Sequence, residues 1–326
     1  MLNDVIFGLL GFVVVSAAIV PLSLLVEEMR PVPPTPARLS WAPDIPIRYV
    51  SVNGVRLRFI KTGDGPALVL LHTLRTQLDL FEKVVPDLAK SFTVYAVDYP
   101  GHGYSDIPAA KYDADYFVET IEGFLETLDL HDVALAGVSI GASIALILAA
   151  RNNPRVSRVV AINPYDYAKG RGMARSSFLA RLFVALADVP ILGDTVMRLR
   201  QFVIMKSALE GGVAKPERIP PELLKEMYLV GNRKGHYRAF LALLRNAESW
   251  ETATNAYSNI KIPVLLLWGA RDWSRRDERE HDRQIVPGAK MATVEDGGHF
   301  LPLDRPDAVI EHLFAFQAPL VGKASS

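Results

Sequence analysis

Short apolar runs alternate with longer amphipathic segments along most of this chain, and each kind of run predicts one kind of element. Continuous apolar runs are typical of buried parallel strands, whereas apolar residues spaced three or four positions apart are typical of helices. The predicted strands are residues 47–52, 56–61, 67–71, 93–97, 133–138, 156–162, 263–268 and 290–294. The predicted helices include residues 78–89, 116–128 and 139–151. This alternation predicts an α/β fold with a mostly parallel central sheet and helices on both faces.

Two interruptions of the pattern refine this prediction. Asn53-Gly54, between the first two predicted strands, favours a tight hairpin and therefore an antiparallel edge to the sheet. The alternation stops after Asn163 and resumes at Ile262, with strand-poor, helix-patterned sequence between them. Ligands of such sheets bind outside the carboxyl ends of the strands, where an insertion forms a lid. The predicted divisions are a core of residues 47–164 and 260–318, a helical lid of residues 165–259 and a tail of residues 319–326.

The N-terminal segment has a different pattern, because residues 5–26 are 22 residues without a charged side chain. As a helix this run is about 33 Å long, at about 1.5 Å per residue, and a bilayer's hydrocarbon layer is about 30 Å thick. We predict that residues 1–28 are a membrane anchor with a transmembrane helix; a cleaved signal peptide or a buried helix are the alternatives. Arg30 and Arg38 follow the span and none precedes it, which favours a cytoplasmic catalytic domain.

The segment after the anchor, residues 29–46, is rich in proline. Its run Pro31-Val32-Pro33-Pro34-Thr35-Pro36 predicts a stiff, extended spacer. We therefore expect this segment to act as a linker between the anchor and the core.

Composition excludes several classes of function. The 326 residues carry no net charge and no long basic run, so we expect no nucleic-acid partner. The chain has no cysteine, which excludes disulfides, thiolate nucleophiles and cysteine-bound metals. No histidine or carboxylate cluster has metal-ligand spacing, and no phosphate-binding or dinucleotide-binding motif is present, so we expect no metal and no cofactor.

Candidate chemistry begins at Gly137-Val138-Ser139-Ile140-Gly141, which lies between two apolar runs. A strand, a sharp turn and a helix place Ser139 at the apex of the turn, and the two glycines leave room for that turn. The amide of Ile140, near the start of the helix, points toward a developing oxyanion. This pattern is typical of a nucleophilic serine.

Serine needs a base, and the base needs an acid that orients it. His299 lies in a glycine-rich loop after the last predicted strand, and Asp272 closely follows the strand before it. Asp166 follows the strand that ends at Ile162 and is the reserve acid. The simpler interpretations are that His299 caps the next helix and that Asp272 is an ordinary helix cap.

The order Ser139, Asp272, His299 along the chain is that of the α/β-hydrolase triad. Residues 48–318 resemble the α/β-hydrolase superfamily in its lidded form. The segment Asp98-Tyr99-Pro100-Gly101-His102-Gly103-Tyr104-Ser105-Asp106 also resembles the glycine motif that follows the family's fourth strand. This resemblance implies the hydrolase fold and a structural role for His102.

The same resemblance implies that His72 helps to shape an oxyanion loop and that the amide of Leu74 is the second oxyanion donor. The family has a glycine after this histidine, whereas this chain has Thr73, which visits positive φ less readily. Arg75 and Gln77 follow at once. They either face the pocket and bind a polar or anionic substrate group, or they are solvated residues at the start of a helix.

The first part of the lid, residues 169–206, holds seven Lys or Arg residues against Asp188 and Asp194. Apolar residues recur in it at helical spacing: Phe178, Leu179, Leu182, Phe183 and Leu186. One interpretation is an amphipathic helix packed on the core. The other is a face that rests on anionic lipid headgroups and admits a lipophilic substrate.

These patterns together lead to one leading hypothesis, a membrane-anchored serine hydrolase that cleaves a carboxylic ester or a related acyl bond of a small hydrophobic substrate. Carbon–carbon bond hydrolases and cofactor-free haloperoxidases keep the same triad and remain alternatives. Epoxide hydrolases and haloalkane dehalogenases need a carboxylate nucleophile where this chain has Ser139. The alternative of another class is a non-catalytic membrane scaffold with a hydrolase fold. Neither oligomeric state nor substrate identity follows from the sequence.

Overall fold

A computed structural model describes residues 18–321 and shows one eight-stranded sheet. Its strand order is β1-β2-β4-β3-β5-β6-β7-β8. The strands are β1 (Ile47–Val52), β2 (Val55–Thr62), β3 (Ala67–Leu71), β4 (Thr93–Val97), β5 (Val133–Val138), β6 (Val156–Ile162), β7 (Val264–Gly269) and β8 (Lys290–Val294). Strands β1 and β2 are antiparallel, and β4, β3, β5, β6, β7 and β8 run parallel. The predicted mostly parallel sheet with an antiparallel edge is confirmed.

Local sequence explains the turn of the β1–β2 hairpin, and it also explains why residues 78–89 form two helices and not one. Asn53 and Gly54 both have positive φ, 50° and 79°, as a tight hairpin turn requires. Residues 78–89 were predicted as one helix but form two short ones, η1 (Leu78–Phe81) and α2 (Val85–Leu88). Pro86 lies in the first turn of α2, where its missing N–H is tolerated, so it starts a new helix.

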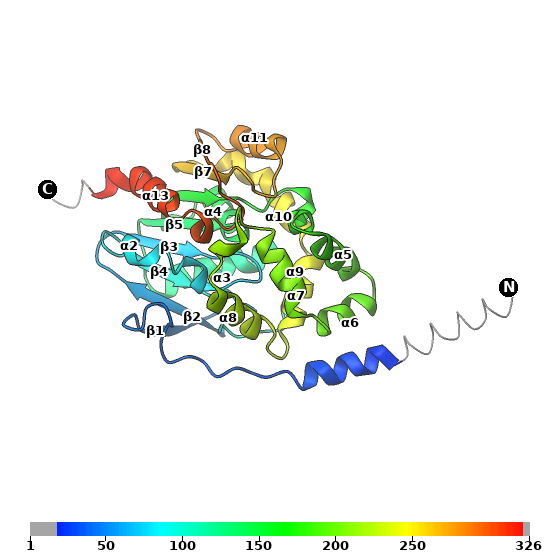
Figure 1. Cartoon of the computed structure of the whole chain (residues 1–326). Coiled ribbons are helices and arrows are strands. Elements are labelled where there is room, and N and C mark those ends of the chain that lie inside the picture. Colours follow the sequence, from blue (N-terminus) through cyan, green and yellow to red (C-terminus); the bar gives the residue numbers. More distant parts are fainter. Residues whose placement is uncertain (1–17, 322–326) are drawn as a thin grey trace.

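The remaining core helices lie beside the sheet (Figure 1). Helix α4 follows β5 and is buried along its whole length, because all its residues from Ile140 to Ala150 are shielded from solvent. Helix α3 packs on it, and its buried and exposed faces alternate at helical spacing. The core helices other than α2 are α3 (Ala114–Thr127), α4 (Ile140–Ala150), α11 (Arg276–Ile285), α12 (Leu301–Asp304) and α13 (Pro306–Val321).

The chain between β6 and β7, which holds the segment predicted as a lid, contains helices and no strand. Figure 1 shows α5, α6 and α9 grouped beside the sheet. Its longer helices are α5 (Phe178–Ala187), α6 (Leu192–Arg198), α7 (Phe202–Glu210), α8 (Pro221–Gly231), α9 (His236–Arg245) and α10 (Glu248–Ala253). Short 3₁₀ turns complete it: η2 (Ala168–Gly170), η3 (Gly172–Arg175), η4 (Pro216–Arg218) and η5 (Thr254–Asn259).

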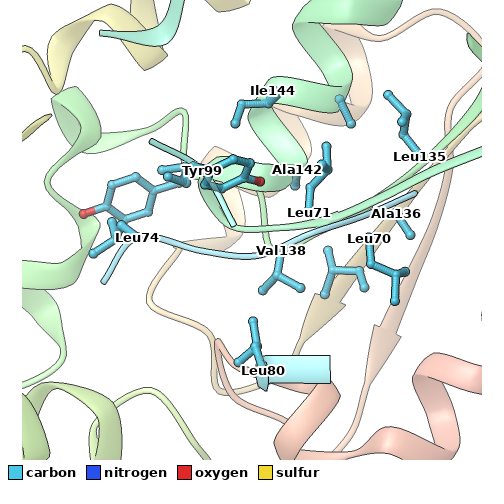
Figure 2. Close-up of a cluster of buried hydrophobic side chains, with 14 of the residues drawn as sticks. Leu70, Leu71, Leu74, Leu80, Tyr99, Leu135, Ala136, Val138, Ala142 and Ile144 are labelled. Carbon is cyan, nitrogen blue, oxygen red and sulfur yellow. The ribbon is translucent and has the colours of Figure 1, made fainter. Parts of the chain in front are cut away.

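One apolar cluster supports the turn that carries Ser139. Figure 2 shows Leu70 and Leu71 of β3 with Ala136 and Val138 of β5 and Ala142 of α4. These side chains are almost completely buried. Burial stabilises by about 25 cal/mol per Å² of apolar surface, so this packing holds the strand ends and the start of α4 in one rigid unit.

The described part of the N-terminal segment packs on the lid and on the core. Residues 18–28 are helical, and Glu27 binds Arg200 of the lid at 2.8 Å and the amide of Gly235 at 2.8 Å. Residues 31–36 contain neither helix nor strand, as their prolines predict. Trp41, farther along, donates to Asp79 at 2.8 Å, so the second half of the linker packs on the core.

The predicted membrane span lies largely outside the described residues. Residues 5–17 of the span precede them, and residues 322–326 of the predicted tail follow them. Within residues 18–321, no helix combines the length and the apolar character that crossing a membrane requires. The anchor therefore stays a prediction.

Candidate active site

Ser139 lies at the apex of the turn between β5 and α4, as its glycine-flanked motif predicts. Its φ and ψ are 59° and −121°, a conformation that L-residues rarely adopt. A Cβ atom on Gly137 would lie 2.1 Å from the carbonyl oxygen of Gly141, and one on Gly141 would lie 2.2 Å from that of Leu71. Both glycines are therefore required for the turn, which is the nucleophile elbow of this fold.

Asp272 and His299 meet at the carboxyl ends of β7 and β8. Nδ1 of His299 lies 2.5 Å from Oδ1 of Asp272, and neither side chain has exposed surface. The amide of Ser274 donates to the second carboxylate oxygen at 2.8 Å. Burial raises the pKa of Asp272, but the charge of His299 and these hydrogen bonds outweigh it, and the pKa falls below its ordinary value. The ionised carboxylate thus holds the proton of His299 on Nδ1.

The bond between serine and histidine is not formed in this structure. Ser139 Oγ and His299 Nε2 are both sealed from solvent, and neither has a hydrogen-bond partner among the described residues. Catalytic hydrogen bonds are often long in ligand-free enzymes and shorten when substrate binds. The structure thus assembles the acid–base pair and the nucleophile elbow, and it leaves free the two atoms that the predicted triad joins.

Asn163, which sequence reasoning missed, links the acid loop to the base loop. Its side-chain nitrogen donates to the carbonyl oxygens of Gly298 and His299 at 3.0 and 2.9 Å. Its side-chain oxygen accepts from the amide of Gly269 at 2.8 Å. The sequence feature that indicates a role for Asn163 is its position directly after β6, at the carboxyl edge of the sheet. One amide therefore fixes the spacing between the loops that carry Asp272 and His299.

Trp273 was also missed, although it directly follows Asp272. Its ring stacks on that of His299, with centroids 3.8 Å apart and an angle of 14° between the planes. Its Nε1 donates to the carbonyl oxygen of Gly211 in the lid at 2.8 Å. Phe300 packs edge-on against both rings. His299 is thus enclosed by aromatic side chains, one of which is fastened to the lid.

The reserve acid, Asp166, lies elsewhere. It accepts a hydrogen bond from Tyr257 at 2.8 Å, and its carboxyl group lies close enough to that of Asp282 for each to shift the pKa of the other. Burial raises the pKa of Asp166 to about 6, whereas Tyr257 lowers it. The carboxylate that contacts His299 is therefore Asp272, and Asp166 belongs to a separate buried pair.

The predicted oxyanion donors are two free amides at the same edge. Ile140 is the first residue of α4, so its amide has no acceptor within the helix. Among the described residues the amide of Leu74 makes no recorded hydrogen bond. Thr73 is not among the described residues with positive φ, whereas Arg75, two residues further along, has a φ of 60°.

His72 and His102 are buried neutral side chains. His72 accepts from the amide of Tyr99 at Nε2 and lies 2.8 Å from the carbonyl oxygen of Thr73 at Nδ1, so Nδ1 carries the proton. Burial lowers the pKa of each histidine to about 3. Neither bonds Ser139 or Asp272, which agrees with the structural roles that the resemblance implies.

The glycine motif after β4 is built around Asp98. The carboxylate of Asp98 accepts from the amides of Leu78 and Tyr104 at 2.7 and 2.9 Å and from Arg58 at 2.5 Å. A Cβ atom on Gly103 would lie 1.9 Å from Asp98, so only glycine fits there. The motif therefore fastens the loop beside the elbow to the core.

A narrow cavity separates the carboxyl edge of the sheet from the lid. Its volume is about 580 Å³, which includes space that opens to solvent. Leu74, Arg75, Trp273 and Phe300 line it from the core, with no exposed surface of Ser139. The lid contributes a mainly apolar wall, which includes Met173, Phe183, Ile204, Met205, Leu209 and Phe240.

Arg75 and Gln77, which follow the predicted oxyanion loop, have different surroundings. Arg75 lines the cavity, whereas Gln77 is buried and donates to Asp79 at 2.7 Å. Neither is a solvated residue at a helix start. Within residues 18–321, no three histidine or carboxylate side chains are arranged as metal ligands.

Comparison with known proteins agrees with this geometry. A family profile described as alpha/beta hydrolase fold matches residues 66–306. This match covers more than half of the chain, and the protein belongs to that family of hydrolases. The predicted superfamily resemblance is confirmed.

Relatives within the family differ in their reactions. The chain is 26% identical to a soluble epoxide hydrolase of Corynebacterium sp. over 281 residues, which cover 82% of this chain and 96% of that protein. It is 25% identical to carboxylesterase YbfK of Bacillus subtilis over 282 residues, 85% of this chain and 89% of that one. The crystal structure of Cfl2 from Burkholderia cenocepacia matches with a TM-score of 0.75 and 26% identity, covering 87% of this chain and 99% of that one. The family match supports a hydrolase, and the printed names of these relatives include more than one reaction.

Proposed function

We propose that this protein is a serine hydrolase that cleaves a carboxylic ester or a related acyl bond of a hydrophobic substrate. The observation that carries the proposal is the serine at the strained elbow after β5, together with a buried His299–Asp272 pair after β7 and β8 of the same sheet. An epoxide hydrolase or a dehalogenase needs a carboxylate at the elbow, so Ser139 favours the acyl-transfer reaction of an esterase.

In the proposed mechanism Ser139 Oγ attacks the carbonyl carbon while His299 Nε2 takes its proton. Asp272 keeps the other imidazole proton on Nδ1 and stabilises the imidazolium that forms. The amides of Leu74 and Ile140 donate to the oxyanion. His299 then protonates the leaving group, and water hydrolyses the acyl-enzyme with His299 again as the base.

The cavity supports a hydrophobic substrate, because its lid wall is mainly apolar. Because Ser139 has no exposed surface, Trp273 or the lid has to move before a substrate reaches it. Carbon–carbon bond hydrolases and haloperoxidases use the same triad and remain alternatives, to be separated by a panel of esters, amides and vinylogous diketones. A non-catalytic scaffold does not require the strained serine.

The test of the proposed function is Ser139→Ala. We expect it to lower the rate of p-nitrophenyl butyrate hydrolysis by at least about 1,000-fold, because no nucleophile remains. It is also expected to abolish labelling by a fluorophosphonate probe. The matched control is Ser143→Ala, one helical turn further along α4, which keeps the label. Full labelling of Ser139→Ala would contradict the assignment.

We also propose that residues 5–26 attach the protein to a membrane, with the lid facing the lipid. The described end of this run supports the proposal, because Leu22, Leu24 and Leu25 are about half exposed. On the lid, Phe178 and Leu182 point outward from α5 while Phe183 is buried. Some apolar residues of α5 are therefore buried in the protein, and others form an exposed apolar face. The cytoplasmic side of the domain stays a prediction.

Vesicle sedimentation tests the attachment. We expect the full-length protein to sediment with phosphatidylcholine vesicles and a variant without residues 1–26 to remain in the supernatant. If the lid contacts lipid headgroups, adding anionic lipid restores part of the binding of the shortened variant. Equal sedimentation of both proteins without anionic lipid would contradict attachment through residues 5–26.

A further inference from the structure

The cavity contains a guanidinium whose charge the protein itself does not balance. Arg75 lines the cavity next to Leu74, the predicted oxyanion donor. Its Nη1 donates to the carbonyl oxygen of Gly231 at 2.7 Å and to Nδ1 of His236 at 3.1 Å. No carboxylate lies within ion-pair distance of Arg75 among the described residues, although one is available to its neighbours.

Those neighbours make the imbalance larger. Glu27 binds both Arg200, at 2.8 Å, and Arg30, at 3.1 Å, so one carboxylate serves two guanidiniums. Arg200 also donates to the carbonyl oxygen of Gly231, which brings its charge close to that of Arg75. Burial, and then the charges of Arg200 and Arg30, lower the pKa of Arg75 to about 9, which leaves it protonated at neutral pH. Burial holds the pKa of His236 well below its ordinary value, so its ring is neutral and accepts a hydrogen bond from Arg75 without balancing the charge.

The geometry of Arg75 leaves one edge for a ligand. Nη1 already has two acceptors, and Nη2 has only a long contact of 3.4 Å to Asn232. Nε makes no hydrogen bond among the described residues, and it is not one of the sealed polar atoms. The edge formed by Nε and Nη2 is a fork that binds a carboxylate through two parallel N–H bonds. The protein thus holds the back of the guanidinium and leaves this fork open.

We propose that Arg75 binds a carboxylate carried by the substrate, so that the natural substrate is an acyl compound with an apolar chain and an acidic group. This inference rests on the proposed function, because it assigns a substrate class to the same cavity. The cavity is narrow, and the two oxygens of a planar carboxylate match the two N–H groups of the fork. The Phe240 ring, 5.4 Å from the guanidinium, and the apolar lid wall accommodate the chain beside it.

The test compares two esters of equal length with the full-length protein. Mono-p-nitrophenyl adipate carries a free carboxylate, and its methyl ester, methyl p-nitrophenyl adipate, does not. We expect the wild type to have the higher kcat/KM for the charged ester. Arg75→Gln is expected to lower the charged-to-neutral ratio of kcat/KM by roughly 10- to 100-fold, mainly through KM, since hydrogen bonds between charged groups are lost. Arg75→Lys, which keeps the charge and loses the fork, is expected to fall between the two.

The control is Arg171→Gln, which removes a lid arginine that pairs with Asp188 outside the cavity. It is expected to leave the ratio unchanged. If the charged-to-neutral ratio of kcat/KM were the same in the wild type and in Arg75→Gln, the inference would be overturned. The proposed function would still stand in that case, provided that both proteins hydrolyse the esters and Ser139 is labelled.

Failure of the proposed function gives a different result, because the wild type then shows neither labelling nor hydrolysis of either ester. Calorimetry then decides on Arg75 by comparing monomethyl adipate with dimethyl adipate. Tighter binding of the acid that Arg75→Gln abolishes supports the anion site, and equal binding of the two compounds overturns it.

Discussion

Arg58 and Arg75 are both shielded from solvent, Arg58 almost completely and Arg75 in part, and their surroundings differ. Arg58 of β2 donates to Asp98 at 2.5 Å and to Asp79 at 2.7 Å, with 1% of its side chain exposed. Burial lowers the pKa of Arg58, but the two carboxylates outweigh it and raise the pKa above its ordinary value. Arg75, in the cavity, has carbonyl, amide and imidazole partners and no carboxylate among the described residues.

This difference indicates that the charge of Arg58 stabilises the fold, whereas the charge of Arg75 is available to a ligand. Asp79 also accepts from Trp41 and Gln77, so the group around Arg58 is complete without any other molecule. An uncompensated buried charge costs stability, and proteins keep such groups mainly where they act on a substrate. Removing Arg58 is therefore expected to affect folding, and removing Arg75 to affect ligand binding.

The largest expected effect comes from substituting the two arginines in the same way. Arg58→Met leaves Asp79 and Asp98 buried without their cation, and we expect it to lower the free energy of unfolding by about 3–5 kcal/mol. Arg75→Met removes a cation without a carboxylate partner, so we expect a change within about 1 kcal/mol, toward higher stability. Urea denaturation of both variants at pH 7 measures the contrast. Equal losses in the two variants would show that Arg75 also has a structural counter-ion.

A smaller effect is expected at a third buried charge group, Asp166 and Asp282. Burial, and then the charge of Asp166, raise the pKa of Asp282 well above its ordinary value, and burial raises that of Asp166 to about 6. The folded state thus holds more protons than the unfolded state, and stability falls as pH rises from about 4 through 6. Asp282→Asn removes one of the two carboxylates. We expect it to raise the free energy of unfolding by about 1–2 kcal/mol at pH 8, with little gain at pH 4.

The matched control is Asp277→Asn, because Asp277 is an exposed carboxylate in the first turn of the same helix, α11. It is expected to change stability by less than about 0.5 kcal/mol at either pH. A gain for Asp282→Asn that is as large at pH 4 as at pH 8 would mean that the effect does not come from charge repulsion.

The features predicted correctly from the sequence are those that local patterns determine. Six strands of the parallel sheet and the elbow at Ser139 follow from apolar runs and from glycines within a few residues of the feature. Asp272 and His299 could be predicted because both lie in the short loops after strands, whose ends meet at one edge of the sheet. Pro86 is also a local signal, because it marks the start of the second helix within residues 78–89. The apolar periodicity of this segment alone predicts a single helix.

Contacts between distant segments were not predictable in this way. Asn163 acts through bonds to residues 106 to 136 positions away, and no pattern around it indicates them. The Glu27–Arg200 pair joins a predicted anchor to the lid across 173 positions. The positive φ of Arg75 was likewise not predicted, because nothing in the residues around it indicates that backbone conformation.

The stacking of Trp273 on His299 has a consequence for the order of events in catalysis. When the imidazole takes the serine proton, the new cation lies directly against an indole face, the aromatic surface that attracts positive charge most strongly. The same indole is fastened to Gly211 of the lid. Opening the lid far enough to move this ring would remove that attraction, so the energetic cost of proton transfer depends on whether the entrance is shut. Premature activation of the serine in an open, water-filled site is thereby disfavoured.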